Sequence, residues 1–148
     1  MRRARRFPPT ARELRLFCTA WARLAQARMM HARMDAPAVL RRLRRPARAP
    51  GRPRAGAPTA DEMRWALAAA ARRAPWRADC LVQALAGKMW LESLGRDAEL
   101  RLGALRGADG ALTAHAWLEL DGLPATGGAL SPELAAFAPA ADPPAAPD

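Results

Sequence analysis

The strongest constraint on the fold is an apolar run at helical spacing that begins beside a cysteine. Asp79 precedes the run and is a favoured N-cap residue, so Cys80 is predicted to be the first residue of a helix. Gly95 is typical of the position just past the helix end. Free backbone N–H groups and the helix dipole at a first turn favour a reactive thiolate. The apolar positions are Leu81, Val82, Leu85, Met89, Trp90 and Leu94.

An antiparallel sheet is predicted to follow this helix. Apolar residues alternate with polar or small ones over 98–105, which is typical of a half-buried strand. A turn at 107–110 leads to a second strand over 111–120. The dipeptide Asp121-Gly122 is a hairpin signal that leads to a short third strand over 123–127. A sheet of this order can lie against the cysteine helix.

Three further helices are predicted before the cysteine. Residues 11–34 carry apolar side chains at three- and four-residue steps with most arginines elsewhere, which indicates an amphipathic helix. A short helix covers 37–45, and Thr59 with Glu62 is a capping-box signature for a helix over 60–73. The apolar stripe of the first helix contains Leu14, Phe17, Cys18, Trp21, Leu24 and Ala25.

These elements predict an α+β chain in which the cysteine helix packs on a small antiparallel sheet, preceded by an N-terminal helical extension. Residues 1–10 are expected to be a basic disordered arm, and 11–45 an N-terminal helical segment. The proline-, glycine- and arginine-rich stretch 46–58 is interpreted as a mobile linker. A core that holds the cysteine helix and the sheet is expected over 59–137, and a disordered tail over 138–148.

The net charge of +10 over 148 residues raises the question of an anionic partner. Much of this charge is arginine before residue 55. Such a segment is more often a solvated face or tail than a specific site, so nucleic-acid binding is not expected. The arginines also interrupt the apolar residues near the N-terminus. Neither a signal-peptide core nor a transmembrane segment is therefore predicted.

The two cysteines are expected to differ in role. Cys18 and Cys80 form neither a disulfide framework nor a C-x-x-C metal pair, so we expect a reducing cytoplasmic location and no metal or cofactor. Cys18 falls on the apolar stripe of its helix and is expected to be a small buried hydrophobe. Cys80 is the candidate nucleophile.

His115 is the candidate base. It follows Cys80 by 35 positions (115 − 80) and lies on the second predicted strand, where we expect it to face the N-terminus of the cysteine helix. The imidazole would take the thiol proton, the thiolate would attack an amide carbonyl, and the imidazolium would protonate the leaving amine. The backbone N–H of Cys80 is the expected oxyanion donor. The alternative is a buried cysteine and a structural strand histidine.

Three stretches of the chain resemble one family. CLVQAL at 80–85, the strand at 98–103 and AHAWLELDG at 114–122 are similar to the transglutaminase-like cysteine peptidase of lasso-peptide biosynthesis. The family that these stretches resemble is the leader peptidase, which is the protease half of the microcin-processing B protein. The similarity covers about 60–128.

The resemblance implies that 59–137 forms a papain/transglutaminase-like cysteine peptidase core with Cys80 and His115 as catalytic residues. It also implies cleavage of the leader from a ribosomally made precursor peptide, after which a separate cyclase closes the macrolactam ring. In that family a small separate or fused domain recognises the leader. Because this chain shows no such domain, a separate leader-recognition protein is the implied partner, beside the precursor and the cyclase.

The third member of a triad is missing from its simplest place. Asp121 is the obvious carboxylate, but six residues at about 3.3 Å each put it roughly 20 Å along the strand from His115. It is better explained as the turn residue before Gly122.

A two-residue turn would place Gly128 opposite His115, with Gly127 beside it. The family pattern often has an aspartate there. Three alternatives remain: a dyad with a backbone or water partner, a carboxylate such as Glu133 or Asp142 that folds back, or an impaired copy. An absent orienting group usually slows a triad without abolishing it.

Neighbouring residues have structural interpretations first. Trp117 shares the face of His115 and is expected to pack against the cysteine helix. Gln83 is expected to be a solvent-facing or capping residue, and Glu119 a surface residue. Trp76 and Arg77, just before the nucleophile, are candidates for lining a substrate cleft.

Two other functions fit the same sequence. An acyl or amide transferase on this fold would share the Cys80–His115 pair and differ only in its acceptor. A non-catalytic basic binding module would instead use the arginine-rich first half, and its Cys80 would be unreactive.

Overall fold

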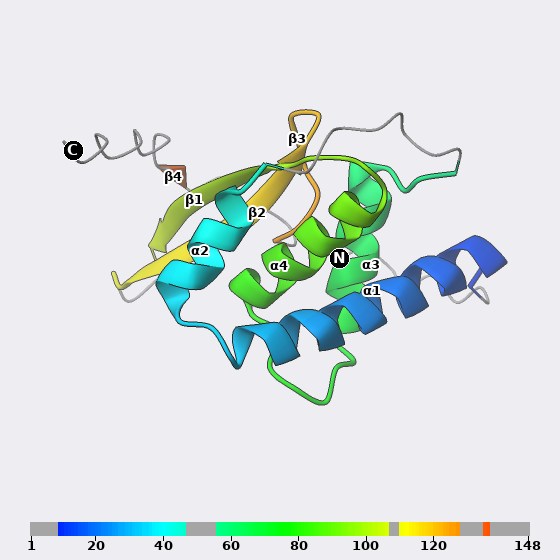
Figure 1. Ribbon diagram of the computed structural model, residues 1–148, viewed down its shortest axis with the longest axis horizontal. Coiled ribbons are helices and arrows are strands. Elements are labelled where there is room, and N and C mark those ends of the chain that lie inside the picture. The colour runs from blue at the N-terminus through cyan, green and yellow to red at the C-terminus, as the bar shows by residue number, and fades with distance from the viewer. Residues whose placement is uncertain (1–8, 47–55, 107–109, 128–134, 137–148) are drawn as a thin grey trace, which may run out of the picture.

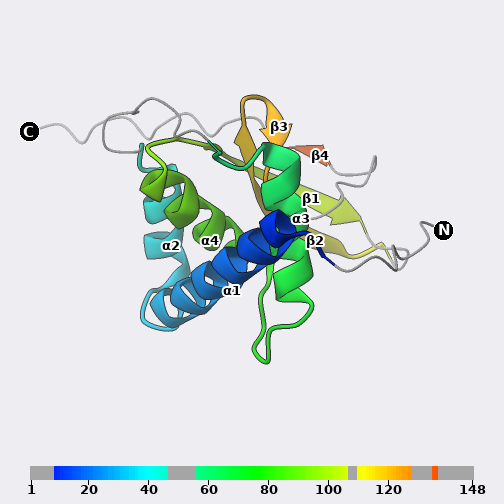
Figure 2. The same ribbon diagram turned by 90° about the vertical axis from the view of Figure 1, so that its right-hand side faces the viewer.

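The computed structural model describes residues 9–46, 56–106, 110–127 and 135–136, which form an α+β fold as predicted. The helices cover one face of an antiparallel sheet (Figure 1; Figure 2). The helices are α1 (Ala11–His31), α2 (Ala36–Arg44), α3 (Ala60–Ala71) and α4 (Cys80–Ser93). The strands are β1 (Glu99–Arg106), β2 (Leu112–Leu120), β3 (Leu123–Pro124) and β4 (Ala135–Ala136).

Figure 1 shows α4 at the centre of the molecule, between α1 and the sheet. Its N-cap is Asp79, whose side chain accepts a hydrogen bond from the Val82 N–H, and the chain leaves the helix through Gly95 at φ 70°. Both predicted ends are therefore confirmed. Because α4 packs on α1, α2, α3 and β2, it is buried on almost every side. Its buried residues are Val82, Ala84, Leu85, Ala86, Gly87, Lys88, Trp90 and Leu91.

The sheet has the strand order β3-β2-β1-β4, and each described pair is antiparallel. Leu120 pairs with Leu123 across the two-residue turn, in which Asp121 and Gly122 have φ of 53° and 77°. These positive values are what a type I′ hairpin requires, so the turn prediction is confirmed. The third strand is shorter than predicted, and β4 was not predicted, because two alanines carry no alternation signal.

The burial of α1 differs from the prediction. Thr10 and Glu13 form a capping box at its start. The buried residues are Leu16, Ala20, Leu24 and Ala27. The prediction that Cys18 is buried is wrong, because its side chain is exposed. The alanines on the buried face let α1 approach α3 and α4 closely. This face is therefore buried in preference to the face of α1 that carries larger side chains.

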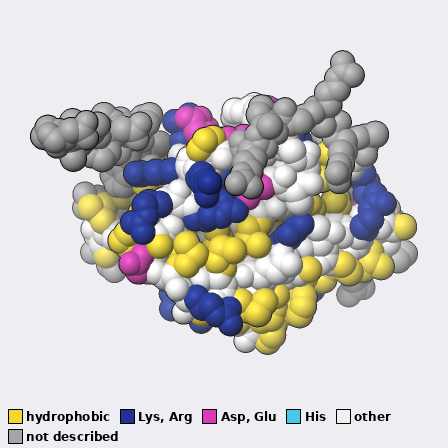
Figure 3. All heavy atoms as spheres, in the orientation of Figure 1, with side chains coloured by type: hydrophobic (Ala, Val, Ile, Leu, Met, Phe, Trp, Pro, Cys, Tyr) yellow, Lys and Arg dark blue, Asp and Glu magenta, His cyan; other side chains and the backbone are white. Residues whose placement is uncertain are grey.

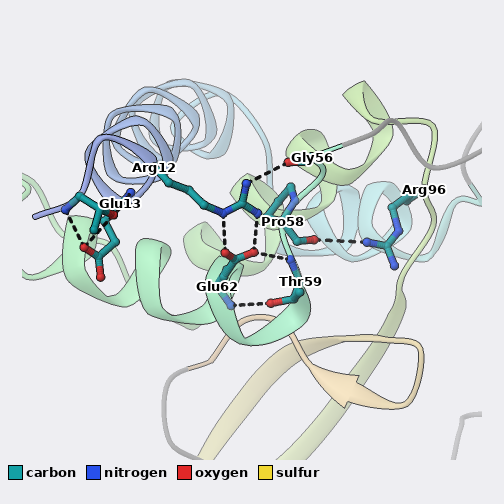
Figure 4. A network of polar contacts seen from close by, with 8 residues as sticks. Arg12, Glu13, Gly56, Pro58, Thr59, Glu62 and Arg96 are labelled. Atoms are coloured by element: carbon teal, nitrogen blue, oxygen red, sulfur yellow. Dashed lines mark hydrogen bonds and ion pairs between the residues drawn. The ribbon is translucent and has the colours of Figure 1, made fainter.

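The end of the predicted linker is bound to the helices. Arg12 of α1 forms a two-pronged ion pair with Glu62 of α3, at 2.7 and 2.8 Å, as Figure 4 shows. Arg96 donates to the Pro58 carbonyl, and Pro58 is buried. The core joins residues of α1 and α2 to those of α3, α4 and the sheet. Four predicted segments lie wholly or mostly outside the described residues. They are the arm (except its last two residues), most of the linker, the 107–109 turn and the tail.

Gly87 is expected to tolerate no side chain. A Cβ at this position would lie 2.5 Å from Thr126 Cγ2 and 3.3 Å from Leu118 Cδ1. Overpacking of this kind costs about 1–3 kcal/mol, which exceeds the gain of about 1 kcal/mol in helix propensity. Gly87→Ala should therefore lower the free energy of unfolding measured in urea. Thr126→Ser removes Cγ2 and keeps the hydroxyl that accepts from the Leu118 N–H. The double variant should recover much of the loss, and no recovery would contradict the packing explanation.

Glu62 should make stability depend on acid pH. The Arg12 guanidinium, and after it the Thr59 N–H, lower the pKa of the Glu62 carboxyl to about 2. Its contribution is therefore full above the ordinary carboxyl range and is lost as the pH falls from about 4.5 toward 2. Urea unfolding at several acid pH values should show a shallower loss for Glu62→Gln than for the unchanged chain. Asp61→Asn, at a side chain 76% exposed, is the matched control and should leave the profile unchanged.

Candidate active site

Cys80 is the first residue of α4 and is partly exposed. The residues beside it are held in place by several bonds. Asp79 caps the helix, and its carbonyl accepts from the Gln83 N–H at 2.9 Å. Gln83 Nε2 donates to the Ala78 carbonyl at 2.9 Å, which confirms a capping role for this side chain. The first backbone N–H groups of a helix have no partner within it, so the thiol lies beside free donors.

His115 lies on β2, opposite Gly103 of β1, and its ring is partly buried. The ring stacks on Trp117 with a centroid separation of 5.9 Å. Side chains along a strand alternate between the two faces of the sheet. His115, Trp117 and Glu119 therefore share one face.

The face that meets α4 is the other one. Leu118 Cδ1 lies beside Gly87 of α4, so it is Leu118, and not Trp117, that packs against the cysteine helix at this point. The expectation that the sheet lies against α4 is confirmed. The expectation that His115 faces the start of α4 is not confirmed. Because side chains alternate along β2, the His115 ring lies on the face of the sheet that points away from α4.

Cys80 and His115 nevertheless lie at similar heights along the sheet. Figure 1 shows α4 and β2 running in broadly the same direction. From the contact between Gly87 and Leu118, seven helical residues lead back about 10 Å to Cys80, and three strand residues lead back about 10 Å to His115. Among the described residues, no hydrogen bond joins Cys80 Sγ to the ring. The structure thus brings the two residues to one end of the fold without pairing them.

Gly127 occupies the space beside the far nitrogen of the ring. A Cβ on Gly127 would lie 3.0 Å from His115 Nε2 and 2.8 Å from Trp117 Cβ, and the residue has φ 90°. A carboxylate side chain at this position has no room. This fits the prediction that a glycine lies where an aspartate is expected. Gly128, Glu133 and Asp142 lie outside the described residues.

Asp121 is confirmed as a turn residue. It forms an ion pair with Arg96 and adopts the left-handed conformation of the hairpin. The sequence analysis missed a polar cluster on the His115 face, where Glu119 accepts from Trp117 Nε1 at 3.1 Å and from Arg101 Nε at 3.0 Å. Glu119 is thus anchored at the surface. The signal for this cluster was Arg101, which the register places opposite Trp117.

The segment before Cys80 packs against α1. The Trp76 ring meets Trp21 edge-on at 5.0 Å between centroids, and Arg73 lies 5.6 Å above the Phe17 ring. The Trp76 Nε1 atom is buried and finds no acceptor in the described part of the chain. Arg77 is exposed. Trp76 therefore packs between α1 and the nucleophile segment.

Neither of two surface cavities contains the candidate residues. One, of about 330 Å³, lies between the start of α3 and the β2–β3 turn and is bounded by Arg96 and Asp121. The other, of about 390 Å³, lies beside Arg42 and Glu92. Among the described residues, no three His, Cys, Asp or Glu side chains are grouped to hold a metal ion. No helix in this part of the chain is long and apolar enough to cross a membrane.

Comparison with known families adds one finding. The family model of the transglutaminase-like superfamily matches residues 20–142, which include α4 and β2. The chain belongs to the transglutaminase-like superfamily. Searches of curated proteins and of solved structures found no match. Members of this superfamily are commonly cysteine-dependent enzymes, among them peptidases and transferases. The matched region begins within α1 and extends through α2, α3, α4 and the described strands.

The two thiols should differ in reactivity. At pH 7, Cys80 in a Cys18→Ser chain should react with iodoacetamide about tenfold or more faster than Cys18 does in a Cys80→Ser chain, because only Cys80 lies at a helix N-terminus. Mass spectrometry of the alkylated protein gives both rates. Equal rates for the two thiols would contradict an activated Cys80.

Proposed function

We propose that the chain is a cysteine peptidase that removes the leader from a lasso-peptide precursor. The observation that carries the proposal is a partly exposed cysteine on the first turn of α4 in a chain of the transglutaminase-like superfamily. The resemblance of residues 80–85 and 114–122 to the leader peptidase supports the finer assignment.

In the proposed mechanism, His115 takes the proton from Cys80 Sγ, the thiolate attacks the carbonyl carbon of the scissile amide, and the oxyanion is bound by the free N–H of Cys80. The C–N bond then breaks, and His115 returns the thiol proton to the leaving amine. Water, deprotonated by His115, hydrolyses the thioester and restores the thiol.

The pairing of Cys80 with His115 is part of the proposal. It requires the start of β2 to turn the His115 side chain from the face that it shares with Trp117 to the face that meets α4, so that the imidazole comes within hydrogen-bond distance of Sγ. Catalytic hydrogen bonds often form only in the substrate complex. Gly127 leaves no room for a side chain beside Nε2, which supports a dyad over a triad at this position.

Precursor processing tests the proposal. The chain should be incubated with a lasso-peptide precursor and a leader-recognition protein, and the leader fragment measured by mass spectrometry. Cys80→Ala should abolish cleavage, and Cys18→Ser, a matched substitution at the other thiol, should leave it unchanged. His115→Ala should slow cleavage by about 100-fold or more. Equal losses from the two cysteine variants would refute the assignment of Cys80.

A transferase is the second candidate, because the superfamily includes transferases as well as peptidases. Added amines separate the two functions. A peptidase gives mainly the free acid, whereas a transferase gives mainly the amide of the added amine. Both require the same acyl-enzyme on Cys80.

A further inference from the structure

The outer face of α1 is a second apolar surface, which no other described helix or strand covers and which Trp76 contacts only at Trp21. The name outer stripe is used here for Leu14, Cys18, Trp21, Ala25 and Met29. Leu14, Trp21 and Met29 are 53%, 38% and 54% exposed, and Cys18 is exposed as well. Large apolar side chains that line up on one exposed face mark an interaction site more often than scattered ones do.

The spacing of the outer stripe is that of a helix seam. Its members follow one another by four, three, four and four residues, and at 100° per residue they fall within an arc of about 80°. The residues of α1 that are buried in the core fall within another arc of about 80° on the opposite side. A stripe this narrow is typical of a seam between two helices, whereas wider apolar faces are typical of helices that lie on a larger surface.

Arginines border the outer stripe on both sides. On the helical wheel, Arg28 lies next to Trp21, and Arg15 lies next to Met29. The segment after α3 adds Arg73, which lies above Phe17. Within the described part of the chain, these arginines form no ion pair with a carboxylate. Figure 3 shows hydrophobic and arginine side chains intermingled on the face along which α1 runs.

This charge distribution is uneven across the molecule. The ion pairs of the described chain lie at Arg12, Arg42, Arg64, Lys88, Arg96 and Arg101. The border of the outer stripe therefore has positive charge without a counter-charge. A second copy of the chain would bring like charges together, because the chain has a formal charge of +10. A partner with the opposite charge is favoured.

We infer that the outer stripe binds an acidic amphipathic helix of a partner protein. The apolar side chains of that helix would pack along the seam of α1, and its carboxylates would pair with the bordering arginines. This inference is independent of the peptidase activity, because the outer stripe includes neither Cys80 nor His115.

A designed peptide provides the probe. The probe is a fluorescein-labelled helix of about 20 residues, with leucines at the seam spacing and glutamates on both borders. A peptide of the same composition in scrambled order is the control. Binding to full-length Cys80→Ala protein is measured by fluorescence anisotropy, and only the helical peptide should bind. In this protein Cys18 is the sole thiol, so its alkylation rate reports directly on the outer stripe. Bound peptide should slow this rate about tenfold or more.

Matched variants locate the binding site. Leu14→Asn with Met29→Gln should weaken peptide binding about tenfold or more, because the burial of each apolar side chain accounts for about that factor in the dissociation constant. Leu112→Asn with Leu123→Gln changes two similarly exposed leucines on the sheet and should leave binding unchanged. Far-UV circular dichroism checks that each variant is folded.

The charge component has its own pair of variants. Arg15→Glu with Arg28→Glu should weaken binding, and Arg44→Glu with Arg45→Glu at the end of α2 should weaken it less. The inference is overturned if the scrambled peptide binds equally well, if the stripe and sheet variants behave alike, or if Cys18 stays unprotected. Stripe-dependent binding to vesicles of anionic lipid, without binding of the peptide, would instead assign the outer stripe to a membrane surface.

Discussion

The burial of α4 on nearly all sides is the constraint on which the rest of the structure depends. A helix that is enclosed by α1, α2, α3 and β2 must be apolar around most of its circumference, and its exposed or partly exposed residues lie toward its two ends. Its two charged side chains are both in ion pairs, Lys88 with Asp97 and Glu92 with Arg42. Gly87 admits the side chains of Thr126 and Leu118 to the helix surface. The same enclosure that fixes the core therefore leaves Cys80 at an accessible end.

The helices around α4 distribute charge and apolar surface unevenly. Arg12 and Glu62 tie α1 to α3 on the core side, where the burial of alanines brings the helices close together. On the other side of α1, apolar residues and arginines face solvent. Trp21 joins this outer surface to Trp76, four residues before the nucleophile. The contact between these two rings is a direct physical link between the proposed binding face and the candidate active site.

Local signals in the sequence were sufficient to predict the ends of elements but not which faces meet. Asp79, Thr59 and Asp121-Gly122 act through bonds or backbone angles within a few residues, and each has its predicted role. The two apolar arcs of α1 are equally wide on a helical wheel, so only packing decides that the alanine-rich arc is buried. Alternation along β2 predicts which residues share a face. Alternation does not predict that the Leu118 face of β2, rather than the His115 face, meets α4. Leu118 and Leu120 made the Leu118 face the more apolar of the two.

Lys88 has a consequence for the fate of any thioester formed by this chain. It is the only lysine in the sequence, it is 1% exposed, and its ammonium group is paired with Asp97. The remaining side-chain positive charge is arginine, whose guanidinium stays protonated and is a poor nucleophile. An acyl group on Cys80 therefore meets no accessible lysine on the same molecule or on a neighbouring copy. Crosslinking of one copy to another through a lysine side chain is therefore disfavoured, and the acyl group remains for water or for another amine.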